Sequence, residues 1–332
     1  MRITYFHRRQ QGTNFSIERV FDDVRKALPS GVQHNVAMAG FVSRGFWRRL
    51  YNAIEAVFRQ GDVNHITGDV HYLACLLCKR RTLLTIHDCV TLERLRGFRW
   101  HVFFFFWYRL PEKRSALISV ISESTKQQLL RYLKCLPEKI RVIYDPVSND
   151  FQPAPHEFNS EKPTILQVGT GRNKNLLRIA EALRNIPCHL RIIGKLDGEQ
   201  ERKLEECRID YSSAAGISDT EIVAEYRQCD MLVFVSTYEG FGLPIVEANA
   251  TGRPVVTSNI LSMPEIAGDA ACFADPLDVA SIRQAVLRII EDSVYREELV
   301  KHGYKNADRF RPAAIAAQYV SLYRELMGQS QS

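Results

Sequence analysis

The most informative stretch of the sequence is Ser236-Thr-Tyr-Glu-Gly-Phe-Gly-Leu-Pro-Ile-Val-Glu247, which follows an apolar strand candidate at 231–235. Its glycines Gly240 and Gly242 can take backbone angles that other residues avoid, and they let a ligand approach the main chain. Pro244 suits the first position of a helix, where its missing N–H is not needed. The stretch therefore predicts a strand, a tight loop, and a helix whose N-terminus can hold a diphosphate.

Two carboxylates belong to the same stretch. Glu239 lies in the predicted loop, and Glu247 is expected in the first turn of the helix, beside the same pocket. Ionised carboxylates only accept hydrogen bonds, so the pair suits the vicinal hydroxyls of a sugar or ribose. The alternative is a structural strand–turn–helix in which Glu247 merely favours the helix dipole. The combination of two glycines and two carboxylates argues against that alternative.

Short apolar runs alternate with helical patterns twice along the chain. Such runs indicate parallel strands covered on both faces, so we predict an α/β fold with two Rossmann-like, doubly wound domains. A proline-rich linker at 151–163 separates the halves. We expect a first domain at 1–150, a second at 151–312, and a C-terminal helix at 313–332 that packs back on the first domain. The predicted strands are 2–6, 35–39, 63–66, 81–86, 116–121, 140–143, 164–168, 190–193, 231–235, 254–257 and 272–274.

Composition narrows the class of protein. The chain has 332 residues and a net charge of +6 that is spread along its length, so we expect no nucleic-acid partner. Eight cysteines include one close pair, Cys75 and Cys78, without a second pair; we expect buried free thiols rather than zinc ligands. The N-terminus lacks a secretory pattern and no apolar stretch is long enough to span a bilayer, so we expect a cytoplasmic protein.

The stretch Glu239–Glu247 resembles the E-x7-E motif of family-four, retaining glycosyltransferases with the GT-B fold, in which two Rossmann-like domains face each other across a cleft. The similarity continues through Gly252-Arg-Pro-Val-Val-Thr257 and is strong over about 160–310. In that family the first Glu contacts the donor sugar and the second binds the ribose. The resemblance therefore implies a nucleotide-diphosphate sugar as donor, held by Glu239, Gly240, Phe241, Gly242, Leu243 and Glu247.

The same comparison points to the loop Val168-Gly-Thr-Gly-Arg-Asn-Lys-Asn175. Its glycines do not complete a dinucleotide fingerprint, so we expect no nicotinamide cofactor. The family places an Arg and a Lys here to neutralise the diphosphate. Lys174 matches the Lys, and Arg172 substitutes for the Arg, whose usual position is Thr170. Gly12, in the first loop of the chain, stands where relatives approach the phosphates.

In the first half, Thr85-Ile-His-Asp88 ends a predicted strand. The family carries a His at this strand end, near the scissile bond, so His87 joins Glu239 and Lys174 as a catalytic candidate. Gly68-Asp-Val-His71 also resembles the family and makes His71 a secondary candidate. The alternative for both histidines is an ordinary surface or core role.

The resemblance implies a retaining hexosyltransferase that needs no cofactor and acts on a glycan or lipid-linked acceptor in surface polysaccharide biosynthesis. Because no D-x-D triplet occurs in the chain, we expect no metal. Two competing hypotheses are a sugar-nucleotide epimerase on the same fold and a non-catalytic sugar-binding module.

Two segments rich in aromatic and basic residues, 44–58 and 96–110, suggest that the first domain lies on an anionic membrane surface. The first places Trp47, Leu50, Tyr51, Ile54 and Phe58 on one helical stripe. The alternative is that the aromatic residues of 98–110 belong to the core of the domain.

Overall fold

The computed structural model describes residues 1–9 and 16–329, and the chain divides into two compact units. The first unit combines Met1–Pro146 with Pro312–Ser332, and the second is Val147–Arg311. The C-terminal helix α14 (Pro312–Gln329) therefore belongs to the first unit, where the hydroxyl of Tyr323 lies 2.8 Å from His65 Nδ1 in strand β3.

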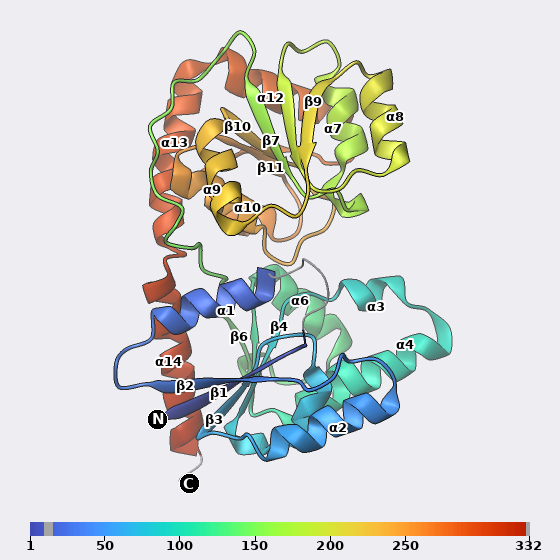
Figure 1. Ribbon diagram of the computed structural model, residues 1–332, viewed down its shortest axis with the longest axis vertical. Coiled ribbons are helices and arrows are strands. Elements are labelled where there is room, and N and C mark those ends of the chain that lie inside the picture. Colours follow the sequence, from blue (N-terminus) through green and yellow to red (C-terminus); the bar gives the residue numbers. More distant parts are fainter. Residues whose placement is uncertain (10–15, 330–332) are drawn as a thin grey trace. The chain divides into compact units, whose positions relative to one another are not determined.

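The first unit is built on a parallel sheet with the strand order β2-β1-β3-β4-β5-β6 (Figure 1). Strands β3, β4 and β5 are buried along their whole length, as expected of parallel strands covered on both faces. The strands are β1 (Arg2–His7), β2 (Gln33–Met38), β3 (Val63–Ile66), β4 (Thr82–Ile86), β5 (Leu117–Val120) and β6 (Ile140–Val142).

Helices cover this sheet, and the side chains between them form one apolar core that includes Phe6, Leu73, Leu84, Trp107 and Leu129. The helices of the first unit, besides α14, are α1 (Ser16–Lys26), α2 (Phe46–Val57), α3 (Val90–Arg94), α4 (Gly97–Phe104), α5 (Leu110–Arg114) and α6 (Glu123–Tyr132). Short turns of other helical types are η1 (His71–Cys75), η2 (Lys79–Arg81), η3 (Phe105–Arg109) and η4 (Pro137–Lys139).

The second unit repeats the plan with the strand order β12-β11-β10-β7-β8-β9, again all parallel. Helix α7 packs with α8 and α12, whereas α10 packs with α9, α11 and α13, so the sheet is covered on both faces (Figure 1). The strands are β7 (Thr164–Val168), β8 (His189–Ile193), β9 (Asp210–Ala214), β10 (Met231–Phe234), β11 (Val255–Ser258) and β12 (Cys272–Ala274). The helices are η5 (Arg172–Lys174), α7 (Leu176–Leu183), α8 (Gly198–Glu206), α9 (Asp219–Gln228), α10 (Leu243–Thr251), α11 (Met263–Ala267), α12 (Val279–Glu291) and α13 (Ser293–Asp308).

These two sheets confirm the predicted fold class of two Rossmann-like units. In each sheet the chain reverses its direction of winding once. The reversal falls between β1 and β3 in the first unit and between β7 and β10 in the second. In doubly wound sheets ligands bind at the carboxyl ends of the strands beside such a switch point. The fold therefore directs attention to the loops that follow these four strands.

Three details differ from the sequence-based expectations. Strand β9 was not predicted, because Asp210-Tyr-Ser-Ser-Ala214 is a polar edge strand that pairs only with β8. The spacing of Ser124-Thr-Lys-Gln127 predicts a capping box at Ser124, but helix α6 begins after Ser122, whose side chain accepts a hydrogen bond from the Thr125 N–H. The cysteines are free thiols as expected, but Cys78 is exposed rather than buried.

Within residues 1–9 and 16–329 no helix is both long enough and apolar enough to cross a membrane.

Candidate functional site

The predicted donor loops follow the two strands at the switch point of the second unit. The loop after β7 contains η5, and the loop after β10 runs from Val235 to Gly242, where α10 begins. The backbone N–H of Thr237 donates to the carbonyl oxygen of Asn173 at 2.8 Å and ties the two loops together. Side chains far apart in the sequence are thus brought to one place.

Lys174 and Glu239 meet there. The Lys174 ammonium lies 2.7 Å from Glu239 Oε1, and its Nζ is 4.5 Å from the centre of the Phe234 ring. The side-chain amide of Asn173 donates to the same Glu239 oxygen at 3.2 Å and to the Tyr238 carbonyl at 3.0 Å. Both charged side chains are only partly exposed, so their orientations are well determined by their neighbours.

Glycines make room for this pair. Gly169 has a φ of +89°, and a Cβ there would lie 2.9 Å from Lys174 Cε. A side chain at this position would therefore displace the lysine as well as strain the backbone. Gly242, the residue before α10, has a φ of +112° and turns the chain from the loop into the helix.

Ser262 fixes the second loop, although nothing in the sequence singled it out. Its hydroxyl lies within hydrogen-bond distance of two carbonyl oxygens, 3.1 Å from that of Glu239 and 2.8 Å from that of Phe241. The Phe241 ring is buried and packs edge-on against Phe310 at 5.5 Å between centroids. The backbone around the predicted sugar contact is thus held at both ends.

The expected position of Glu247 in the helix is wrong by one residue. Helix α10 begins at Leu243, so Pro244 is its second residue and Glu247 lies in the second turn rather than the first. Only 6% of Glu247 is exposed, and the Tyr226 hydroxyl on α9 donates to its Oε2 at 2.8 Å. Tyr226 was missed because a single tyrosine in an amphipathic helix gives no sequence signal for a polar contact.

Arg172 and Thr170 lie on the other side of the η5 loop. Thr170 donates its hydroxyl to the Lys195 carbonyl at 2.7 Å. Arg172 is exposed and lines a hollow of about 310 Å³ together with Asp197 and Glu199. Lys174 does not line this hollow. The structure therefore unites Lys174 with Glu239 and leaves Arg172 facing carboxylates.

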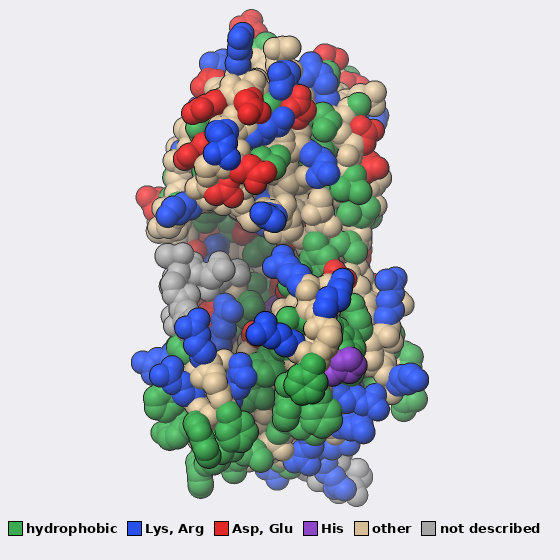
Figure 2. Space-filling model, turned by 90° about the vertical axis from the view of Figure 1, so that its right-hand side faces the viewer, with side chains coloured by type: hydrophobic (Ala, Val, Ile, Leu, Met, Phe, Trp, Pro, Cys, Tyr) green, Lys and Arg blue, Asp and Glu red, His purple; other side chains and the backbone are tan. Residues whose placement is uncertain are grey.

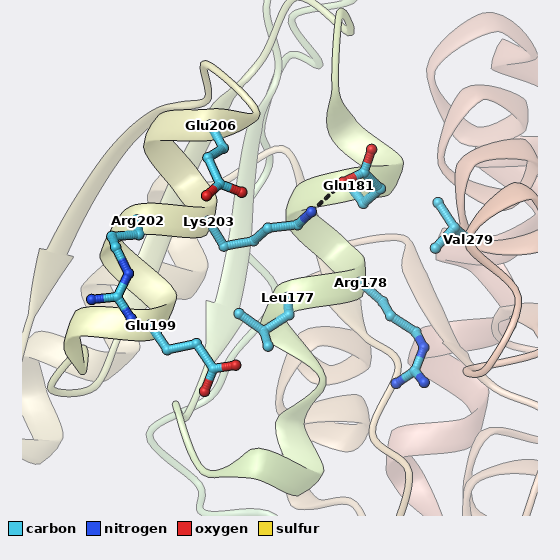
Figure 3. A pocket seen from close by; sticks show the side chains of 8 residues that line it. All are labelled: Leu177, Arg178, Glu181, Glu199, Arg202, Lys203, Glu206 and Val279. Atoms are coloured by element: carbon cyan, nitrogen blue, oxygen red, sulfur yellow. Dashed lines mark hydrogen bonds and ion pairs between the residues drawn. The ribbon is translucent and has the colours of Figure 1, made fainter.

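A larger hollow of about 550 Å³ in the second unit lies between α7 and α8 (Figure 3). Lys203 reaches from α8 to Glu181 on α7, where the two groups form an ion pair. Arg184 also pairs with Glu181, at 3.0 Å. These charges neutralise one another across a surface groove, so we do not assign a catalytic or binding role to this hollow.

The histidine candidates lie in the first unit. His87 follows β4 and donates Nε2–H to the Thr67 carbonyl at 2.9 Å, which fixes the orientation of the ring. His71 is buried and donates Nδ1–H to the Trp107 carbonyl at 2.8 Å; burial lowers its pKa. A buried neutral His71 suits a structural role. Gly12 lies outside the described residues.

Sequence reasoning also missed two histidines inside the first unit. His65 is completely buried between Tyr323 and Thr85, with 2.8 Å from Nδ1 to the tyrosine oxygen and 2.7 Å from Nε2 to the threonine oxygen. Burial, assisted by the charge of Arg25, lowers the pKa of His7 to about 4. Their partners come from other elements, so the sequence of β1 or β3 alone gave no sign of these contacts.

The aromatic segments lie partly on the surface. On the face of the first unit shown in Figure 2, hydrophobic side chains gather beside Lys and Arg side chains. Trp47 is 77% exposed, Phe58 85% and Phe98 82%, whereas Trp107 and Tyr108 are buried. The 98–110 segment therefore contributes side chains both to the core and to the surface of the first unit.

Among residues 1–9 and 16–329, no three His, Cys, Asp or Glu side chains gather in an arrangement that could hold a metal ion. That the protein needs no metal stays a prediction.

Comparison with known proteins places this geometry in a family. The chain is 38% identical to O-antigen chain mannosyltransferase B of Escherichia coli over 110 residues, covering 33% of this chain and 29% of the relative. It is 26% identical to the serotype-specific mannosyltransferase WbdA of Escherichia coli over 282 residues, covering 76% of this chain and 34% of the relative. The chain thus spans only about a third of the length of these curated relatives.

A solved structure with the same fold is Anabaena HepE in complex with UDP-glucose. Its TM-score is 0.78 at 16% identity, and the match covers 98% of this chain and 100% of that one. Residues 148–306 match the family described as glycosyl transferases group 1, and residues 16–151 match the glycosyltransferase family 4. With these two matches extending from residue 16 to residue 306, the chain belongs to the group 1 glycosyltransferases and has their GT-B fold.

Proposed function

We propose that the chain transfers a hexose, with retention of configuration and without a metal ion, from a nucleoside diphosphate sugar to a glycan or lipid-linked acceptor in surface polysaccharide biosynthesis. The observation that carries the proposal is the pairing of Lys174 with Glu239 at the switch point of the second unit. The cation can bind the diphosphate of the donor, and the carboxylate can bind the hydroxyl groups of its sugar.

Lys174 is proposed to hold the diphosphate. Its ammonium carries three N–H groups, so it can keep Glu239 and still donate to a phosphate oxygen. The N-terminus of α10 has no side-chain cap, so the positive end of the helix dipole can favour an anion there. As the diphosphate leaves, the ammonium and the helix dipole would stabilise the charge that develops on it.

Glu239 and Glu247 are proposed to bind hydroxyl groups at the two ends of the donor. Glu239 keeps one oxygen on Lys174 and Asn173, and its second oxygen can accept from a sugar hydroxyl. Glu247 accepts a hydrogen bond from Tyr226 at Oε2 and is proposed to accept from the ribose hydroxyls. Each carboxylate is thus oriented before the donor arrives.

His87 is proposed to act on the chemical step. Its ring is fixed by Thr67 at the carboxyl end of β4, the edge at which ligands of doubly wound sheets bind. A fixed ring can hold a sugar hydroxyl in the transition state without reorganisation.

The relatives suggest the sugar. The two curated relatives described above are both mannosyltransferases, and one is an O-antigen chain enzyme. We therefore propose mannose as the transferred hexose.

We also propose that the first unit lies on an anionic membrane surface. The exposed aromatic residues Trp47, Phe58 and Phe98 would enter the interface, and the arginines nearby would meet anionic headgroups. An acceptor carried by a lipid would be delivered at this surface.

The test is a panel of nucleoside diphosphate sugars, GDP-mannose and UDP-glucose included, incubated with glycan and lipid-linked acceptors in the presence of EDTA. Mass spectrometry and NMR of the products distinguish three outcomes. These are a sugar transferred with retained anomeric configuration, an epimerised donor, and an unchanged donor. Lys174→Ala should lower turnover at least tenfold, because a hydrogen bond to a charged group contributes roughly 1.5–3 kcal/mol. Lys305→Ala, an exposed lysine on α13 of the same unit, is the matched control. An epimerised donor would contradict the proposal in favour of a sugar-nucleotide epimerase. Binding without reaction would contradict it in favour of a non-catalytic sugar-binding module.

A further inference from the structure

An apolar groove of about 540 Å³ opens on the first unit between α2, η1, α4 and η3. Its apolar lining includes Phe46 and Leu50 from α2, Leu76 after η1, Phe98 and Val102 from α4, and Phe106 from η3. Phe46, Phe98 and Phe106 are exposed, so the groove is open to the surface. We call this the apolar groove.

A second hollow, of about 460 Å³, is lined by Arg8, Arg9, Arg44, Arg49 and Asp69, with Val42 and Ser43. Arg8 and Arg9 follow β1, and Asp69 follows β3, so this arginine hollow lies at the switch point of the first sheet. It thus occupies the place in the fold where doubly wound units bind ligands.

Arg49 lines both hollows, so the apolar groove and the arginine hollow adjoin. Its guanidinium donates from Nε and Nη2 to the Ser43 carbonyl at 3.2 and 3.1 Å, and its carbon lies 4.5 Å from the centre of the Trp107 ring. These contacts hold the arginine at the junction.

The charge of the arginine hollow favours an anion. Four guanidinium groups meet one carboxylate in the lining, and Asp69 already accepts a hydrogen bond from the Trp107 indole at 2.8 Å. Arg8 forms an ion pair with Glu18 at 3.0 Å, which leaves the lining net positive. Guanidinium groups bind phosphate oxygens in bidentate fashion.

We propose that the two hollows together bind a lipid phosphate, with the hydrocarbon chain in the apolar groove and the phosphate or diphosphate on the arginines. This inference rests on the proposed function and makes the acceptor a lipid-linked one, presented by its phosphate end. The chain and the headgroup of such a lipid are joined directly, as the groove and the arginine hollow are joined at Arg49. Neither a free phosphate nor a neutral lipid would use both surfaces.

The experiment measures binding of farnesyl phosphate, kept below its aggregation limit, by intrinsic tryptophan fluorescence. The three tryptophans of the chain all lie in the first unit, and Trp107 lines the apolar groove. Farnesyl phosphate should bind at least tenfold more tightly than farnesol and than inorganic phosphate. Equal binding of farnesol would overturn the role of the arginines, and equal binding of inorganic phosphate would overturn the role of the groove.

Matched variants locate the site. Leu50→Asp and Val102→Asp place a charge in the groove, and each should weaken binding at least tenfold. Ile54→Asp makes the same change at an exposed position of α2 outside the groove and should leave binding within about twofold. For the headgroup, Arg44→Glu should weaken binding at least tenfold, whereas Arg48→Glu, exposed on α2 and outside both hollows, should not.

Equal losses in the variants and their controls would show non-specific adhesion and refute the proposal, as would the absence of binding. Donor binding measured on the same samples separates the two proposals. A protein that binds a nucleoside diphosphate sugar but not farnesyl phosphate contradicts the lipid site alone. A protein that binds farnesyl phosphate but transfers no sugar contradicts the proposed function and not the lipid site.

Discussion

Lowering the pH should destabilise the first unit through its buried histidines. The pKa of His7 is lowered from 6.5 to about 4, chiefly by burial and secondarily by Arg25. The folded state therefore holds His7 neutral at a pH where the unfolded chain binds a proton. Such a group contributes stability that is present above pH 6.5 and is lost as the pH falls through 4.

The magnitude follows from this shift. At 1.36 kcal/mol per pKa unit, the contribution of His7 to the free energy of unfolding falls by roughly 2–3 kcal/mol between pH 7.5 and 4.5. Burial also lowers the pKa values of His65 and His71, so both change stability in the same direction. Asp145 acts in the opposite direction, because burial raises its pKa to about 6. As the pH falls from 7.5 to 4.5, its contribution raises the free energy of unfolding by about 2 kcal/mol. Because three histidines act against one carboxyl group, we expect the free energy of unfolding to fall on acidification.

The assay is urea unfolding followed by tryptophan fluorescence, which reports on the first unit because it holds all three tryptophans. His7→Gln has no titration in this range, so its loss of unfolding free energy between pH 7.5 and 4.5 should be smaller than that of the wild type by roughly 2–3 kcal/mol. His34→Gln, at an exposed position in β2 of the same unit, should behave as the wild type. An equal pH dependence in the wild type and His7→Gln would refute the argument.

Three further predictions concern function. Glu247→Ala should weaken nucleoside diphosphate binding at least tenfold, since it removes hydrogen bonds to a charged group; calorimetry on the folded variant decides, and unchanged affinity would remove Glu247 from the site. His87→Ala should lower kcat by about 100–1,000-fold with little change in donor affinity; wild-type turnover would place the ring outside the chemistry. The protein should co-sediment with anionic vesicles at low salt and dissociate as salt screens the arginines, and Trp47→Ala combined with Phe58→Ala should weaken this binding; retention in the supernatant at low salt would contradict membrane docking.

Much of the fold and of the donor site was predictable because it depends on local pattern. Buried parallel strands are continuous apolar runs, and the carboxyl ends of neighbouring strands meet at one edge, which is why Lys174 and Glu239 come together. The polar edge strand β9 has no such run. Tyr226 and Ser262 act through tertiary contacts with residues 21 or more positions away, and no local pattern encodes these partners.

The two carboxylates of the motif look alike in the sequence, but their surroundings differ in the structure. Glu239 is paired with a cation and remains partly exposed, whereas Glu247 is buried and held by the neutral hydroxyl of Tyr226. A carboxylate already paired with Lys174 attracts a sugar hydroxyl less strongly until a phosphate takes part of the lysine's charge. On the proposed function, Glu239 therefore binds the sugar only after the diphosphate has engaged Lys174.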